Sequence, residues 1–277
     1  MPIRITIMIK SFIKNADSLI LSGKLGKAIR LLKHKFMLLT VEKPAREYKV
    51  NDLSSGYISQ YKKNDHSELN ILCDKYGSDK GESDSKDNPY IWPSHNYSDF
   101  YDVMFRLRKS DVSLLVECGL GTNNPKLKSS MGINGKPGAS LRVWRDYFPN
   151  AKIIGVDIDE NVLFSETRIH TYGCDQTSQD SISKFATGAE LQDSSVDIII
   201  DDGLHTFGAG KSFFEGMIKF LTNNGIYVIE DVPARDIILY KDYFLQSREL
   251  YSTHFIVLSS PLRSGGDNRL ICITKNV

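Results

Sequence analysis

The stretch Val196-Asp-Ile-Ile-Ile-Asp-Asp-Gly-Leu-His-Thr206 decides the fold that we expect for this chain. Its first five residues are β-branched except for Asp197, and an Asp-Asp-Gly turn follows them. This pattern is typical of a short strand buried inside a parallel sheet. Ligands of open α/β sheets bind just beyond the carboxyl ends of the strands. We therefore expect Asp201, Asp202 and His205 to lie at the rim of a functional site.

A second stretch, Gly225-Ile-Tyr-Val-Ile-Glu-Asp-Val232, repeats the pattern and ends in two more carboxylates. Asp202, Glu230 and Asp231 would supply oxygen ligands from adjacent strands, which suits Mg²⁺. Alternatively, one or two of these carboxylates are solvated or cap the helices that follow. A histidine three residues after a candidate metal ligand indicates a general base, so we expect His205 and Asp202 to be catalytic.

Strand and helix patterns alternate from Leu114 onwards, which predicts an α/β fold. We expect a doubly wound, Rossmann-like, mostly parallel sheet of seven strands, closed by an antiparallel pair. The expected strands are 114–117, 152–157, 170–174, 196–200, 225–232, 254–258 and 269–274. The expected helices between them are 139–147, 161–168, 178–186, 207–221 and 236–246.

A glycine-containing turn, Glu117-Cys-Gly-Leu-Gly121, follows the first of these strands and lets a ligand approach the backbone. The pair Gly119 and Gly121 alone is weak evidence for any one cofactor. NAD-binding proteins add a third glycine and run directly into a helix that receives the pyrophosphate. Here the third glycine is missing, and a long insertion that starts with Asn123-Asn-Pro125 is expected to displace the next helix.

Polar residues at three successive strand ends favour S-adenosylmethionine instead. Glu117 suits a ligand that carries an amine or a sulfonium. Asp157 is placed to accept ribose hydroxyls, and Asp175 with Gln176 can bond an exocyclic amine. The alternative is that these strand ends only face water.

Composition is that of an ordinary globular protein of 277 residues with a net charge of +1, so no global field favours nucleic acid. No apolar run reaches the roughly 20 residues that a membrane span needs. The start of the chain does not resemble a signal peptide, and we expect a cytoplasmic protein. The cysteines, expected to be buried free thiols, are Cys73, Cys118, Cys174 and Cys272.

Three regions are expected along the chain: a basic helical region with a linker at 1–63, a lid with connecting helices at 64–110, and a cofactor-binding domain at 111–277. Residues 1–49 hold eleven Lys/Arg and three Asp/Glu. Their basic face is a solvated helix surface, or it contacts a partner subunit or an anionic membrane surface. We expect a homo-oligomer.

The polar loop Tyr76–Pro89, which follows an expected helix capped by Asp65, has few residues that can pack. It is either a plain linker or a lid that orders over a ligand.

Several of these motifs together resemble the metal-dependent sugar O-methyltransferases of macrolide biosynthesis. The motifs are Glu117–Gly121, Ser129–Gly132, Gly135–Pro149, Ile154–Asp157, Asp175-Gln176, Asp201–Thr206 and Ile229–Asp231. The resemblance covers about Tyr76 to the C-terminus, and the N-terminal part departs from that family.

The resemblance implies a class I methyltransferase fold, S-adenosylmethionine as cofactor, and Mg²⁺ held by Asp202, Glu230 and Asp231. It also implies His205 as the base and a lid around residues 77–80. Ser78 and Lys80 of this lid, and Asp201 on the rim, then join the cofactor-binding residues.

The expected function is transfer of a methyl group from S-adenosylmethionine to a metal-bound sugar hydroxyl. The acceptor is a glycan or glycoside, either a surface polysaccharide or a glycosylated natural product. The alternatives are methyl transfer to a non-sugar oxygen, an NAD-dependent oxidoreductase, and a non-catalytic nucleotide-binding protein.

Overall fold

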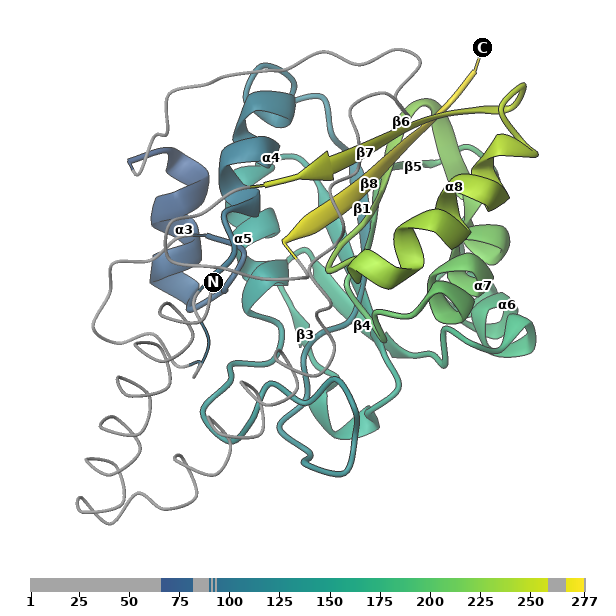
Figure 1. Cartoon of the computed structure of the whole chain (residues 1–277). Helices are drawn as coiled ribbons and strands as arrows, with labels where there is room; N and C mark the ends of the chain where they lie inside the picture. The colour runs from purple at the N-terminus through teal and green to yellow at the C-terminus, as the bar shows by residue number, and fades with distance from the viewer. Residues whose placement is uncertain (1–65, 82–89, 91, 93, 259–267, 277) are drawn as a thin grey trace, which may run out of the picture. The chain divides into compact units, whose positions relative to one another are not determined.

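The computed structural model describes residues 66–81, 90, 92, 94–258 and 268–276 (Figure 1). The predicted helical region and linker at 1–63 lie outside the described residues. So does most of the predicted lid loop, together with the turn between the last two strands.

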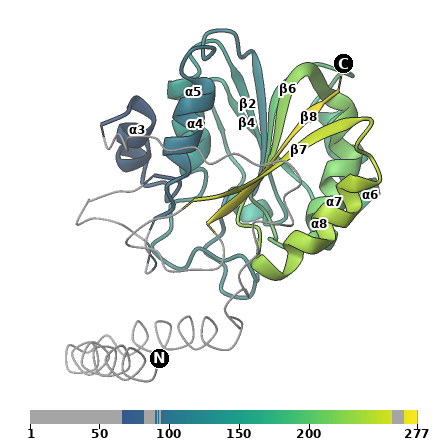
Figure 2. The ribbon, with the colours of Figure 1, turned by 45° about the horizontal axis from the view of Figure 1, so that its top comes forward.

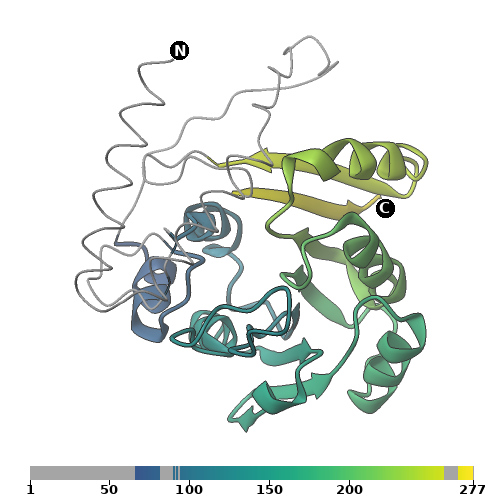
Figure 3. The same cartoon turned by 60° about the horizontal axis from the view of Figure 1, so that its bottom comes forward.

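One sheet of eight strands lies at the centre of the described residues. The strands are β1 (Leu114–Cys118), β2 (Lys152–Asp157), β3 (Ser165–Glu166), β4 (Ile169–Gly173), β5 (Val196–Asp201), β6 (Leu221–Ile229), β7 (Tyr251–Val257) and β8 (Arg269–Lys275). Their order is β3-β4-β2-β1-β5-β6-β8-β7. The five central strands are parallel, and β3, β7 and β8 pair antiparallel at the two edges. Figure 3 shows the sheet from its β7–β8 edge to its β3–β4 edge.

Helices cover both faces of the sheet, which makes the fold doubly wound (Figure 2). One layer contains α3 (Glu68–Tyr76), α4 (Tyr97–Phe105) and α5 (Ala139–Tyr147), and the other contains α6 (Gln179–Gly188), α7 (Phe207–Met217) and α8 (Ile237–Leu245). Short 3-10 turns are η2 (Glu160–Val162), η3 (Ile218–Phe220) and η4 (Ala234–Asp236). Each layer encloses its own apolar core, centred on Tyr101 and Trp144 in the first and on Phe213 and Phe214 in the second.

All seven predicted strands are present, but the predicted helix at 161–168 is wrong. Asp159 caps only the single turn η2, and Arg168 with φ 63° then closes a tight turn between β3 and β4. Arg142 of α5 holds the short strand by an ion pair of 2.7 Å with Glu166. The sheet therefore has an eighth, antiparallel edge strand that the apolar pattern did not indicate.

The helix before Tyr76 begins later than expected. It starts at Glu68, and its cap is Ser67, whose hydroxyl accepts a hydrogen bond from the Asn70 amide at 3.2 Å, so the predicted cap Asp65 is wrong. Cys73, Cys118, Cys174 and Cys272 are free and buried, as predicted. Among the described residues, no helix has the length and apolar character needed to cross a membrane.

The register of the parallel strands brings the predicted site residues to one rim. Cys118 of β1 pairs with Asp201 of β5, which pairs with Ile229 of β6. On the other side, Cys118 pairs with Val156 of β2. Glu117, Asp157, Asp202 and Glu230 therefore leave the sheet at nearly the same level.

Gly119 tests how tightly this rim is packed. Its φ is 95°, and a Cβ built on it would lie 2.1 Å from the carbonyl oxygen of Asp202. We predict that Gly119→Ala lowers the free energy of unfolding by about 2 kcal/mol or more, measured by urea denaturation.

Gly188→Ala is the matched control, because nothing lies within 4 Å of its Cβ position at the end of α6. Alanine there should change stability by less than about 1 kcal/mol, in the stabilising direction. Equal effects at the two glycines would contradict close packing of β1 against the end of β5.

Candidate functional site

A buried lysine joins three of the strands at the rim. The Lys80 ammonium lies 2.6 Å from Asp202 Oδ2, 2.6 Å from Glu230 Oε2 and 3.2 Å from Glu117 Oε1. Lys80 is only 3% exposed, and Glu117 and Glu230 are 0% and 1% exposed. Burial alone would lower the pKa of Lys80, but the three carboxylates outweigh it and raise that pKa well above its ordinary value.

Two aromatic side chains from the first helical layer hold the far oxygens of these carboxylates. The Tyr101 hydroxyl donates to Glu230 Oε1 at 2.6 Å, and the Trp144 indole donates to Glu117 Oε2 at 2.7 Å. Both donors lie in the apolar core between α4 and α5. The packing of that layer therefore fixes the orientation of both carboxylates.

The residues that could hold a divalent cation lie on the other side of Asp202. One ligand atom each from Asp202, His205 and Asp231 lies within 4.8 Å of the others. His205 Nε2 is 3.2 Å from Asp202 Oδ1, and His205 Nδ1 is 3.8 Å from Asp231 Oδ2. The two carboxylates fit a divalent cation such as Mg²⁺ or Mn²⁺, and the imidazole lies beside them. Glu230, the third ligand that the resemblance implies, is adjacent, but its two oxygens already contact Lys80 and Tyr101.

The backbone is strained where this group of ligands is formed. His205 has φ 55° and Asp231 has φ 52°, a left-handed conformation that costs a residue with a Cβ about 1–3 kcal/mol. In the sequence, each lies a few residues after the end of a parallel strand, β5 or β6. The strained turns thus bring the two side chains together over the rim.

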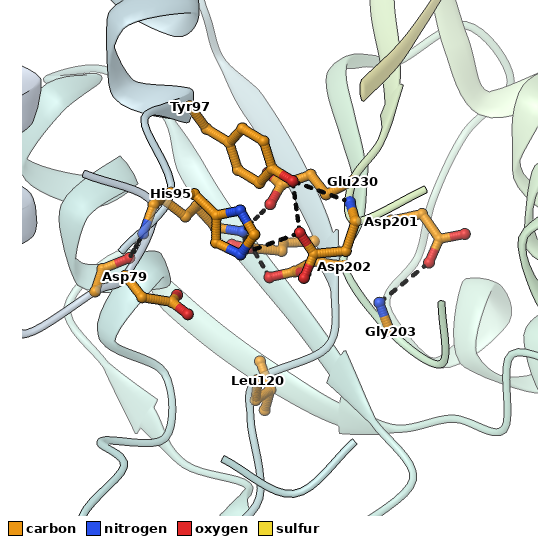
Figure 4. Close-up of polar contacts among 12 residues, drawn as sticks. Asp79, His95, Tyr97, Leu120, Asp201, Asp202, Gly203 and Glu230 are labelled. Carbon is orange, nitrogen blue, oxygen red and sulfur yellow. Dashed lines mark hydrogen bonds and ion pairs between the residues drawn. The ribbon is translucent and has the colours of Figure 1, made fainter. Parts of the chain in front are cut away.

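His95 and Tyr97, which the sequence analysis did not assign to the site, lie beside each other (Figure 4). Both hold Asp231 in place. The Tyr97 hydroxyl donates to Asp231 Oδ1 at 2.5 Å, and His95 Nε2 lies 3.2 Å from the same oxygen. The two rings stack at 4.4 Å, and His95 Nδ1 is 3.2 Å from Asn268 Oδ1. In the sequence, the feature that could have indicated this contribution is a histidine and a tyrosine two residues apart at the start of α4.

The charges around His205 oppose its role as a base in the absence of a cation. Burial alone would lower its pKa, but Asp231 and Asp202 outweigh burial and raise the pKa of His205 to about 10. Burial also works against the charge on Asp202, yet Lys80 and His205 hold the pKa of its carboxyl well below the usual range. Positive charge added between the two aspartates would lower the pKa of His205.

Asp201 and Gln176 contact each other inside the protein. Gln176 Nε2 donates to Asp201 Oδ1 at 3.0 Å, and Gln176 Oε1 accepts from the Leu204 amide at 2.7 Å. Burial raises the pKa of Asp201 to about 6, although the Gln176 bond opposes the rise. Asp201 also lines a small pocket with His205, Glu230 and Tyr240. In this structure Gln176 supports the loop that carries His205, which leaves its predicted contact with an adenine as a proposal.

The predicted ribose-binding residue, Asp157, lies at the glycine turn. Its Oδ2 accepts from the Leu120 amide and its Oδ1 from the Asp159 amide, at 2.8 and 2.9 Å. A carboxylate has about four lone-pair sites, so Asp157 keeps capacity to accept from a ligand hydroxyl. Asp175 accepts bonds from the Thr177 amide and hydroxyl at the start of the loop before α6.

Two expectations about neighbouring loops are wrong. The insertion after Gly121 does not displace the next helix, because the Gly138 amide donates to the Leu120 carbonyl at 2.7 Å and α5 begins beside the turn. The described part of the predicted lid does pack: Ser78 and Lys80 are both buried. The packing of Lys80 depends on partners more than thirty residues away, which the local sequence does not reveal.

Comparison with known proteins shows the class of fold. The MycE methyltransferase of the mycinamycin biosynthetic pathway, in complex with Mg, SAH and mycinamycin VI, has a TM-score of 0.54 at 21% identity. The alignment covers 75% of this chain and 54% of that chain. A second structure of MycE, with Mg and SAH, has a TM-score of 0.53 at 22% identity. The fold is that of a class I methyltransferase.

Proteins with similar sequences indicate which kind of methyltransferase the chain resembles. A tetracenomycin rhamnosyl 3'-O-methyltransferase of Streptomyces olivaceus is 37% identical over 144 residues, which are 51% of this chain and 33% of the relative. The mycinamicin VI 2''-O-methyltransferase of Micromonospora griseorubida is 29% identical over 161 residues, which are 56% of this chain and 37% of the relative. No protein-family model matches the chain. The chain is thus similar to sugar O-methyltransferases and spans about a third of their length.

We predict that the His205 imidazole titrates at a pH of about 10 in the cation-free protein. Asp231→Asn should lower this pKa, because it removes the largest favourable charge. The pKa of His205 is higher in the folded state than in the unfolded state. The imidazolium charge therefore stabilises the folded protein fully below pH ~6.5, and this stabilisation is lost as the pH rises towards 10.

Proton NMR of the histidine rings measures this titration, with His205→Gln to assign the resonance. Asp180→Asn is the control, because Asp180 is an exposed carboxylate on α6 and should leave the His205 titration unchanged. A midpoint for His205 near pH 6.5 in the cation-free protein would contradict the prediction.

Proposed function

We propose that this chain is an S-adenosylmethionine-dependent O-methyltransferase that acts on a sugar hydroxyl with the help of a divalent cation such as Mg²⁺. The observation that carries the proposal is the grouping of Asp202, His205 and Asp231 at the carboxyl ends of β5 and β6. A class I methyltransferase fold and sequence relatives that methylate sugars support it.

The cofactor would lie along the rim formed by β1, β2 and β4. Gly119 and Gly121 give the first turn its positive φ angles, and Asp157 supplies acceptor oxygens beside it. Glu117 Oε1 is buried and has no hydrogen-bond partner among the described residues, although it pairs with the charge of Lys80. An acidic group in this position suits a positively charged ligand. S-adenosylmethionine would supply the methyl group from its sulfonium.

His205 would take the proton of the acceptor hydroxyl, and Asp202 orients its ring through the 3.2 Å contact to Nε2. A divalent cation on Asp202 and Asp231 would polarise the hydroxyl and, by offsetting the carboxylate charge, lower the pKa of His205. Glu230 would also bind the cation if one of its oxygens, which contact Lys80 and Tyr101, used its second lone pair for the metal. Tyr97 and His95 keep Asp231 directed at the site.

The relatives support a glycosylated compound as acceptor. Their names describe 2'-O- and 3'-O-methylation of rhamnosyl tetracenomycins, 2''-O-methylation of mycinamicin VI and 3-O-methylation of an L-olivosyl oleandolide. They give no support to a surface polysaccharide. We therefore place the acceptor among glycosides in which a deoxysugar is attached to an aglycone.

Methyl transfer is tested with isotopically labelled S-adenosylmethionine and a panel of rhamnosyl and olivosyl glycosides, with the free aglycones as controls. Turnover should require the sugar, stop in excess chelator and return with Mg²⁺. His205→Gln should lower turnover by about 10²–10⁴-fold while S-adenosylhomocysteine affinity, measured by calorimetry, stays unchanged.

Full turnover in chelator would remove the cation from the proposal, and near-normal turnover in His205→Gln would move the base elsewhere. The same substitution at an exposed histidine of β4, His170→Gln, is the control and should leave turnover unchanged.

Asp157→Ala should weaken S-adenosylhomocysteine binding by about 1–3 kcal/mol, because ribose hydroxyls would lose a buried acceptor. Calorimetry measures the loss, and Asp193→Ala is the control, because Asp193 is exposed and precedes the amino end of β5, whereas the rim is at the carboxyl end. Because Asp157 also accepts the Leu120 amide, the folded fraction of the variant is checked by thermal unfolding. A folded variant with unchanged affinity would exclude Asp157 from the cofactor site.

A further inference from the structure

The ammonium of Lys80 has as many carboxylate partners as it has hydrogens. Its contacts to Asp202, Glu230 and Glu117 are 2.6, 2.6 and 3.2 Å long. An ammonium has three N–H donors and no acceptor. Lys80 donates hydrogen bonds to Asp202 and Glu230, and it pairs with the charge of Glu117 at 3.2 Å without a hydrogen bond. Its ammonium is therefore engaged by the rim, although the sequence predicted a role in cofactor binding.

Asp202 bridges two positive positions. Its Oδ2 contacts the Lys80 ammonium, and its Oδ1 faces His205 in the group that could hold a divalent cation. In two-metal enzymes a shared carboxylate bridges two cations about 3.5–4 Å apart. Lys80 thus places a positive charge on the second oxygen of Asp202, where such a site has its second cation, and Glu230 and Glu117 are its further partners.

The charges support the same conclusion. Glu117, Asp202, Glu230 and Asp231 place four carboxylates on one rim, and three of them contact Lys80 directly. Burial raises the pKa of the Glu117 and Glu230 carboxyls, and the neighbouring Lys80 ammonium opposes that rise. A cation beside these two buried groups therefore favours their ionised form.

We propose that Lys80 serves as a permanent, protein-borne cation in a two-cation carboxylate site, so that the rim takes up one divalent cation where it would otherwise take two. This inference rests on the cation site of the proposed function. It makes Lys80 a positioning residue that fixes Asp202 and Glu230 and stays in place when the divalent cation binds.

The alternative is exchange, in which the divalent cation displaces Lys80. Displacement would leave Glu117 and Glu230, both buried from water, without their ammonium partner. One cation near Asp202, His205 and Asp231 would have to compensate all of these charges. The contacts therefore favour simultaneous occupancy.

The test counts bound Mn²⁺ by electron paramagnetic resonance, with no turnover involved. Wild-type protein should bind about one equivalent, and Lys80→Ala about two, because the variant frees both space and three carboxylates. Lys75→Ala is the control: Lys75 is on the same segment but exposed and paired with Asp146, so it should bind as wild type does. Lys80→Arg keeps the charge and should also bind about one equivalent.

The outcomes separate this inference from the proposed function. An unchanged Mn²⁺ count and affinity in folded Lys80→Ala overturns the inference. If wild type binds no Mn²⁺, the cation of the proposed function fails and this inference fails with it, whereas one equivalent in both wild type and folded Lys80→Ala overturns this inference alone.

A second measurement uses the wild-type chain in case Lys80→Ala does not fold even with Mn²⁺. Acetylation of lysines, followed by mass spectrometry, should modify Lys75 and leave Lys80 protected both without and with Mn²⁺. Protection in both states supports the inference. Mn²⁺-dependent acetylation of Lys80 in the folded protein indicates exchange and overturns it.

Discussion

Burial of like charges at one end of the sheet is the constraint on which the rest of the site depends. Parallel strands in register deliver Glu117, Asp202 and Glu230 to one rim, and each is unfavourable there without a compensating charge. Lys80 provides this charge from the segment after α3, and Tyr101 and Trp144 supply hydrogen bonds from α4 and α5. The first helical layer is thereby connected to the functional rim by polar contacts as well as by its apolar core.

The same rim explains why strain is stored at two residues. His205 and Asp231 have left-handed backbones, although glycine would adopt that conformation at lower cost. Their side chains have to meet beyond the ends of neighbouring strands, and a turn with positive φ accomplishes this within a few residues. Tyr97 and Thr206, which respectively bond Asp231 and cap α7, hold these turns from both sides. Stability is given up locally to keep these two side chains in one position.

The sequence predicted the fold well because burial in a parallel sheet leaves a strong local pattern. The alternation of strand and helix patterns marked all seven main strands, most clearly in the β-branched runs of β2 and β5, and the acidic residues at the strand ends marked the rim. The sequence did not indicate β3, because this strand is only two residues long and is held by an ion pair with Arg142 of α5. It also missed the inward bonds of Gln176 and the contribution of His95, because partners far apart in sequence decide them.

Lys80 also connects the two halves of the site. Glu117 belongs to the turn where the cofactor is proposed to bind, and Asp202 and Glu230 belong to the strands where the cation is proposed. A change of charge on either side alters the partners of the same ammonium. Since α5 begins beside the glycine turn, as it does in dinucleotide-binding folds, the position of that helix does not distinguish this site from theirs. The distinction lies in the acidic rim, which favours positively charged ligands and works against a diphosphate.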